Sequence, residues 1–152
     1  MKTRGFIRTG LMAGLGLISI ITSAIAETDA KKIEPLALQK IMRDMGKSMQ
    51  AITNGISRED WALVAKNAVL VADHPQPPLG EKIRILMFAG SNVTRFKEYD
   101  GKTHDAAKVL GELAVEEDSY GVIQAFAELQ NTCLACHQSF RKSFQEHFYG
   151  AR

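Results

Sequence analysis

The positions of proline narrow the folds open to this chain of 152 residues more than any other feature. All four prolines lie at position 35 or between positions 75 and 78, so residues 36–74 and 79–152 contain none. Both proline-free stretches are rich in Ala, Leu, Met, Lys, Glu and Gln, the residues that favour helices. Neither contains an alternating apolar–polar run bounded by turn residues, which would indicate a strand. The sequence therefore predicts an all-α protein.

The first 26 residues have the pattern of a secretory signal peptide. Three basic residues lie within the first eight positions, an apolar run follows over residues 11–25, and Ala24-Ile25-Ala26 supplies the small residues of a cleavage site. The apolar run is shorter than the roughly 20 residues of a membrane-spanning helix. We therefore expect export, cleavage after Ala26 and a mature domain of residues 27–152 in the periplasm.

Removal of this leader changes the charge of the chain. The remaining residues carry 16 Lys and Arg against 17 Asp and Glu, a net charge of −1, whereas the full chain has +2. Positive and negative residues are interspersed, so the sequence gives no basic face for nucleic acid or for an anionic membrane. We therefore expect neither as a partner.

The first proline-free stretch predicts two helices. The first extends over about residues 35–53, because apolar residues recur every three or four positions at Leu38, Met42, Met45, Met49 and Ile52. Asn54-Gly55 is expected to end it, since glycine often caps a helix in the left-handed conformation. The second helix is expected to begin at Ser57, an N-cap residue with an acid three positions later, and to stop at the loop of residues 74–78.

The second proline-free stretch predicts two more. One helix covers about residues 91–116, with a short helical piece near 81–89 before it, and the sequence leaves open whether Asp100-Gly101 divides it. The last covers about residues 119–148 and has one apolar face. Four amphipathic helices joined mostly by short loops predict an antiparallel four-helix bundle.

Both cysteines of the chain lie in one pentapeptide, Cys133-Leu134-Ala135-Cys136-His137. This is the C-x-x-C-H sequence to which haem c is attached. A helix, at 100° per residue, places the two thiols and the imidazole within one 100° arc. The thiols can then bond to the haem vinyl groups as thioethers while His137 ligates the iron. The sequence therefore predicts one haem c, attached through Cys133 and Cys136, and export agrees with this because the attachment takes place outside the cytoplasmic membrane.

Other uses of the two cysteines fit less well. A disulfide between positions i and i+3 of a helix has poor geometry. A thioredoxin-like redox pair needs a strand before the helix, and no strand is predicted. A zinc site needs a fourth ligand, and His147 points about 80° away from His137 on the same helix.

With Arg141 four residues after His137 on the last helix, the chain resembles the cytochrome c-prime family, which includes low-spin relatives with a methionine as second iron ligand. The resemblance covers about residues 30–150 and is strongest at 133–141. It implies a four-helix bundle around the haem, with Arg141 either covering the imidazole or pairing with a propionate, unless it is a solvated surface residue. Family members often carry Arg-Gln near the start of the first helix, where this chain has Leu38-Gln39.

Because of this resemblance, the first helix is expected to determine how many ligands the iron has. In this family a bulky aliphatic residue there leaves the iron five-coordinate and selective for small gases, whereas a methionine gives a six-coordinate electron carrier. Met42, Met45 and Met49 share one helical face, which is also the pattern of ordinary core methionines. Antiparallel packing puts Met42 and Met45 near the level of His137, and Gly46 and Met49 match the spacing after the ligand in methionine-ligated relatives. We therefore expect Met42 as the second ligand, with Met45 or an open position as alternatives.

The helical pattern also predicts the places of other aromatic residues. Five phenylalanines are candidate walls of the haem pocket: Phe88, Phe96, Phe126, Phe140 and Phe144. Trp61 is expected in the core or at a subunit contact. His74, beside the proline loop, and His104 are expected at the surface.

Together these features predict an exported monohaem cytochrome that passes single electrons between redox partner proteins. The alternative is a five-coordinate protein of the same fold that binds NO or CO. An enzyme is not expected, because no distal acid–base pair is evident. Relatives often dimerise through the first two helices, so a homodimer is one expected assembly.

Overall fold

The computed structural model describes residues 35–150, and within them the protein is helical, with no strand. The all-α prediction is confirmed for this part of the chain. The predicted signal peptide, residues 1–26, lies outside the described residues. None of the helices in the described part is both long enough and apolar enough to span a membrane.

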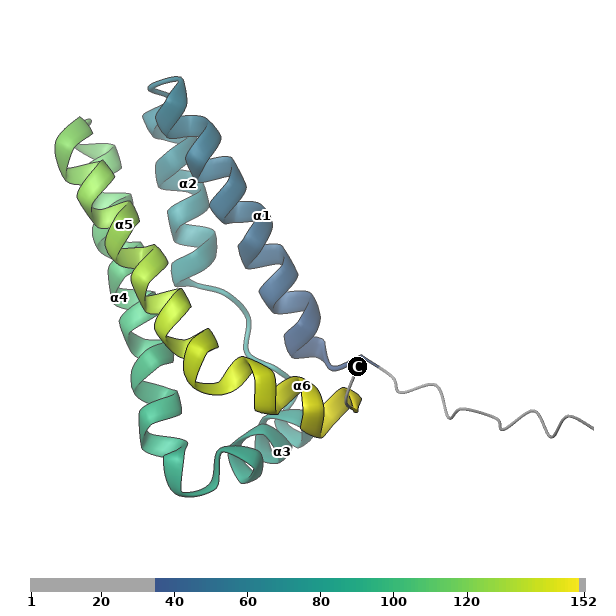
Figure 1. The fold of residues 1–152 in the computed structure, drawn as a ribbon. Helices are drawn as coiled ribbons and strands as arrows, with labels where there is room; N and C mark the ends of the chain where they lie inside the picture. Colours follow the sequence, from purple (N-terminus) through teal and green to yellow (C-terminus); the bar gives the residue numbers. More distant parts are fainter. Residues whose placement is uncertain (1–34, 151–152) are drawn as a thin grey trace, which may run out of the picture. The chain divides into compact units, whose positions relative to one another are not determined.

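Four longer helices pack in chain order. Helix α1 (Ala37–Ser57) packs against α2 (Trp61–Ala72), α2 against α4 (Val93–Val115), and α4 against α5 (Ser119–Cys136). Figure 1 shows α1 running upward and α2 returning beside it, with α4 and α5 paired in the same way. Helix α3 (Leu79–Ala89) and a short 3-10 turn, η1 (Gly90–Asn92), connect α2 to α4 at the lower end.

The predicted last helix is one helical run with a bend. Helix α5 passes into a π-helical segment, η2 (His137–Arg141), and then into α6 (Lys142–Tyr149). Such wider turns are a recognised cause of helix bending. In Figure 1 the chain turns after α5, and α6 runs across the lower end near α3. Phe88 of α3 contacts the rings of Phe144 and Phe148, at centroid distances of 5.4 and 5.6 Å.

Apolar side chains form two buried clusters. The larger joins α1, α2, α4 and α5 and consists of Ile52, Val64, Ala68, Val71, Ala72, Ala107, Leu110, Ala114, Val122, Ala125 and Leu129. The smaller, around Leu36, Ile85 and Phe148, joins the start of α1 to α3 and α6. Glu81 of α3 supports this end, because its carboxylate accepts from the backbone N–H groups of Ala37 and Leu38 at 2.7 and 2.8 Å. Trp61 packs against the larger cluster, in agreement with the expected core position.

The boundary between the first two helices differs from the prediction. Asn54-Gly55 does not end α1, which continues to Ser57, and the N-cap of α2 is Asp60, whose carboxylate accepts from Leu63 N at 3.0 Å. Gly55 is buried, and a Cβ built on it would lie 2.9 Å from Cγ2 of Val64 and 3.1 Å from the carbonyl oxygen of Asp60. The glycine therefore serves the close approach of α2 to α1 and not the termination of α1.

This contact gives a stability prediction. Gly55→Ala is expected to lower the free energy of unfolding by about 1–3 kcal/mol, because the added methyl group overpacks the α1–α2 contact. Gly101→Ala, the matched control, lies inside α4 with no atom within 4 Å of a built Cβ and is expected to stabilise by about 0.5–1 kcal/mol. Urea unfolding followed by circular dichroism measures both. Equal effects of the two substitutions would contradict the close contact at Gly55.

The third predicted helix is continuous. Helix α4 extends through Asp100-Gly101 without a break, which settles the question that the sequence left open. The short helical piece expected near 81–89 is α3, whose bounds are Leu79–Ala89. Because α4 is continuous, residues 96–103 keep regular helical spacing along the wall of the cavity that is described below.

Candidate functional site

A cavity of about 910 Å³ lies between the two apolar clusters. Its walls come from α1, the end of α2 and the loop after it, α3, α4 and the run α5–η2–α6. Val71 belongs to the larger cluster and Ile85 to the smaller, and both line the cavity. A volume of this size falls in the usual range for small-molecule and cofactor sites.

The cysteine motif lies on this cavity. Cys133, Cys136 and His137 all line it, at the junction of α5 and η2. Both thiols are half-buried and neither is in a disulfide. Cys133 also packs against the larger apolar cluster, which holds this end of the motif in place. The two thiols and the imidazole therefore face one shared space.

Burial sets the protonation of these groups. It raises the pKa of the Cys133 thiol, and it raises the pKa of the Cys136 thiol to about 11, with the nearby Asp100 carboxylate adding to the effect. Burial also lowers the pKa of His137, and the positive charge of Arg141 acts in the same direction. A pair of protonated thiols is unlike the activated thiolate of a redox-active C-x-x-C pair, and a neutral imidazole is the form that ligates metals.

Helix α1 brings its methionines to the wall of the same cavity. Met42, Met45 and Met49 all line the cavity, and so does Gly46. Met45 and Met49 are half-buried and pack against the larger apolar cluster, whereas Met42 is 39% exposed. Core packing therefore restrains Met42 less than it restrains Met45 and Met49.

Aromatic and basic residues complete the lining. Phe96, Phe140 and Phe144 line the cavity, and the rings of Phe96 and Phe140 meet edge to face at 5.3 Å. The exposed Arg141 also lines it, one helical turn after His137. The other two candidate phenylalanines do not line it: Phe88 packs in the smaller cluster and Phe126 against the larger.

Tyr99 is a lining residue that sequence reasoning missed. Its hydroxyl accepts from Ser139 Oγ at 3.2 Å and from Arg95 Nη2 at 3.0 Å, which ties α4 to η2 beside His137. These donors lower the pKa of the Tyr99 hydroxyl. The Arg95–Tyr99 spacing of four residues is visible in the sequence, but the partner Ser139 is 40 residues away and gives no local signal.

The surface prediction is wrong for His74, which is buried, whereas His104 is partly exposed. The side chain of His74 is only 6% exposed and that of His104 24%, and both lie beside Asp100 of α4. The proline-rich segment after α2 folds back onto α4, and this contact buries His74 where a solvated loop was expected. His74 and Asp100 also line the cavity. The spacing of four residues between Asp100 and His104 is the signal that could have paired these two.

The residues present fit a haem c. The lining of the cavity includes two thiols and an imidazole from α5 and η2, the thioethers of α1, and mainly apolar and aromatic side chains around them. A covalently held porphyrin with axial nitrogen and sulfur ligands needs this donor set.

Comparison of the chain with protein-family models, with curated proteins and with solved structures finds no match.

Proposed function

We propose that the mature chain is a monohaem c-type cytochrome whose four longer helices form an antiparallel bundle around the haem, as in the cytochrome c-prime family that it resembles. One observation carries the proposal. Cys133, Cys136 and His137 line the same cavity as Met42, which comes from a different helix. In this assignment the two thiols would anchor the haem, and His137 and Met42 would ligate its iron.

The specific function that we propose is one-electron transfer between redox partner proteins in the periplasm. The haem supplies an iron that alternates between the ferric and ferrous states. The protein's own contribution is to bring His137 and Met42 to one cavity and to surround them with apolar side chains. Axial methionine raises the potential relative to a second nitrogen donor, and burial and hydrogen bonding adjust it further.

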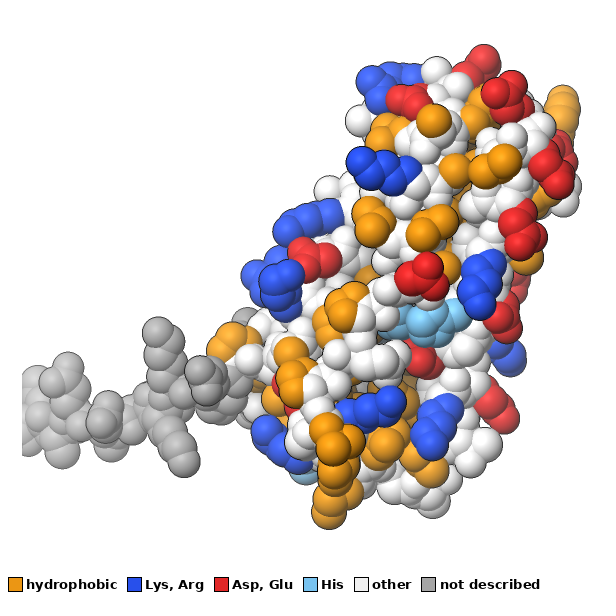
Figure 2. Space-filling view, turned by 180° about the vertical axis from the view of Figure 1, so that it is seen from behind, with side chains coloured by type: hydrophobic (Ala, Val, Ile, Leu, Met, Phe, Trp, Pro, Cys, Tyr) orange, Lys and Arg blue, Asp and Glu red, His pale blue; other side chains and the backbone are white. Residues whose placement is uncertain are grey.

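The face of the molecule in Figure 2 carries charges of both signs. The face in Figure 2 shows basic and acidic side chains interspersed over the helices, with no large field of one sign. This distribution agrees with the near-neutral mature chain. Arg141, exposed at the cavity, is proposed to pair with a haem propionate.

The visible spectrum of the exported protein tests this function. With His137 and Met42 as ligands, both oxidation states are expected to show sharp low-spin bands, and the ferric state a weak charge-transfer band at the red end. Reduction and reoxidation are expected to be reversible with one electron per chain. A high-spin spectrum together with tight binding of CO to the ferrous protein would overturn electron transfer and favour the gas-binding alternative.

A further inference from the structure

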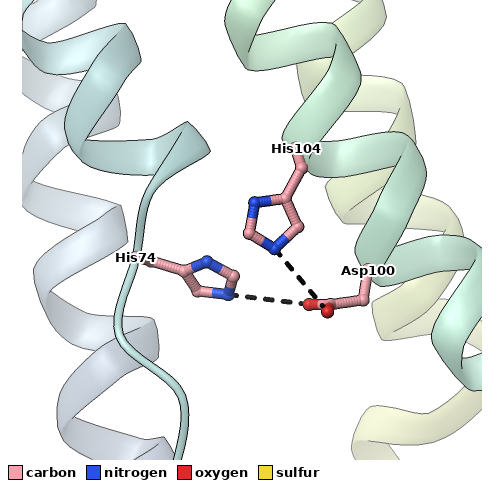
Figure 3. A group of neighbouring side chains, drawn as sticks. All are labelled: His74, Asp100 and His104. Carbon is pink, nitrogen blue, oxygen red and sulfur yellow. Dashed lines mark ion pairs between the residues drawn. The ribbon is translucent and has the colours of Figure 1, made fainter.

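Three side chains of two segments meet beside α4 (Figure 3). Asp100 and His104 share one face of this helix, and His74 comes from the segment after α2. Asp100 Oδ1 lies 3.6 Å from Nε2 of His74, and Asp100 Oδ2 lies 3.6 Å from Nε2 of His104. The two imidazole centroids are 4.5 Å apart, and one potential ligand atom from each residue lies within 4.8 Å of the other two.

The separation between Asp100 and His104 suits a shared ion better than a direct hydrogen bond. A distance of 3.6 Å is longer than the usual range for N–H···O hydrogen bonds. Two ligand atoms that are each about 2.1 Å from a tetrahedral zinc ion are about 3.4 Å from one another. The spacing between the Asp100 carboxylate and Nε2 of His104 is therefore close to that of neighbouring ligands on one metal ion.

The backbone orients His104 for this role. Its Nδ1 is hydrogen-bonded to the carbonyl oxygen of Ala72, at the end of α2. A carbonyl oxygen only accepts, so Nδ1 carries the proton and Nε2 presents its lone pair towards Asp100. A hydrogen bond from the second ring nitrogen to a carbonyl is the usual support of a metal-bound histidine.

The buried Nδ1 of His74 is a second, independent indication of a bound ion. Its side chain is 6% exposed, and within the described residues its buried Nδ1 has no hydrogen-bond partner. Figure 3 shows this nitrogen on the ring edge nearer His104, while Nε2 faces Asp100. A buried polar nitrogen without a partner is costly and calls for an explanation. A metal ion at Nδ1 supplies the partner and leaves the protonated Nε2 facing the carboxylate at 3.6 Å.

We propose that His74, Asp100 and His104 form a binding site for one divalent transition-metal ion of the zinc class. Two imidazoles and one carboxylate make a ligand set typical of such ions, with at least one position left for water, whereas calcium and magnesium prefer oxygen ligands. Solvent reaches the site through Asp100, whose side chain is 43% exposed, and through His104.

The position of the site gives it a structural consequence. His74 and Asp100 also belong to the wall of the large cavity, and His74 lies in the loop that closes this wall. A bound ion joins this loop to α4. Metal binding is therefore expected to stabilise the folded protein and the cavity wall together.

Zinc binding to the exported holoprotein, with any free thiols alkylated, tests the proposal. Competition with a chromophoric chelator is expected to show one Zn²⁺ per chain, and zinc is expected to raise the melting temperature. Asp100→Asn, which keeps the side-chain shape, and His104→Ala are each expected to weaken binding at least tenfold and to remove the thermal shift. Circular dichroism verifies that each variant is folded.

Two matched controls separate this site from general surface binding. His147→Ala removes an exposed histidine of α6, and Asp105→Asn removes an exposed carboxylate beside His104. Both are expected to bind zinc as the parent does. Absence of zinc binding by the parent protein, or equal weakening in controls and site variants, would overturn the proposal.

Discussion

Replacing Cys133 and Cys136 together by alanine is expected to yield protein without bound haem and without a cooperative unfolding transition. The structure gives the physical reason. The described apolar side chains form two clusters on either side of a cavity of about 910 Å³, and both cysteines line that cavity. A ligand that binds only the folded state stabilises it, and its loss removes that contribution.

Extraction with acidified acetone and urea unfolding measure the two effects. The parent protein is expected to keep its haem in the protein fraction and to unfold in one transition. Leu134→Ala, inside the same pentapeptide but 54% exposed, is the matched control and is expected to behave as the parent. A double-cysteine variant that unfolds cooperatively at the parent's midpoint would contradict a core built around the cofactor.

Met42→Ala is expected to convert the iron from low spin to high spin and to open a position that binds CO. It is also expected to lower the reduction potential, because thioether ligation favours the ferrous state. The structural reason is that Met42 lines the cavity and is 39% exposed, so that core contacts restrain it least among the three methionines of α1. Visible spectroscopy with and without CO, together with voltammetry, measures these changes.

Met45→Ala is the matched control one turn away on the same helix. Met45 packs against the larger apolar cluster, so its truncation is expected to cost about 2 kcal/mol of stability and to leave the spin state unchanged. The opposite result, a spin change in Met45→Ala and none in Met42→Ala, would assign the ligand to Met45 and contradict our register for α1.

Much of the helical architecture could be predicted because its signals are local. Proline at 35 and 75–78 bounds α1, α2 and α3, and long stretches of helix-forming residues account for α4 and α5. The error at Gly55 arose because a glycine can end a helix or admit a neighbouring one, and only the contact with Val64 distinguishes the two roles. The π-helical segment at 137–141 has no distinct periodicity in the sequence, so the bend could not be predicted.

The candidate site, like the fold, has one part that could be predicted from the sequence and one part that could not. The cysteines and His137 are adjacent in sequence, and the spacing of Met42, Met45 and Met49 places them on one face, as observed at the cavity. What could not be predicted depends on contacts between distant segments. His74 meets Asp100 and His104 only because the loop after α2 packs against α4, and Tyr99 meets Ser139 only because α4 packs against η2.

The mass of the intact exported protein under denaturing conditions tests the central claim most directly. We predict the mass of residues 27–152 plus one haem, retained after acid and organic solvent, with both cysteines unreactive to alkylating reagents. The mass of the bare polypeptide, with two thiols open to alkylation, would contradict the assignment of Cys133 and Cys136 as haem attachment sites.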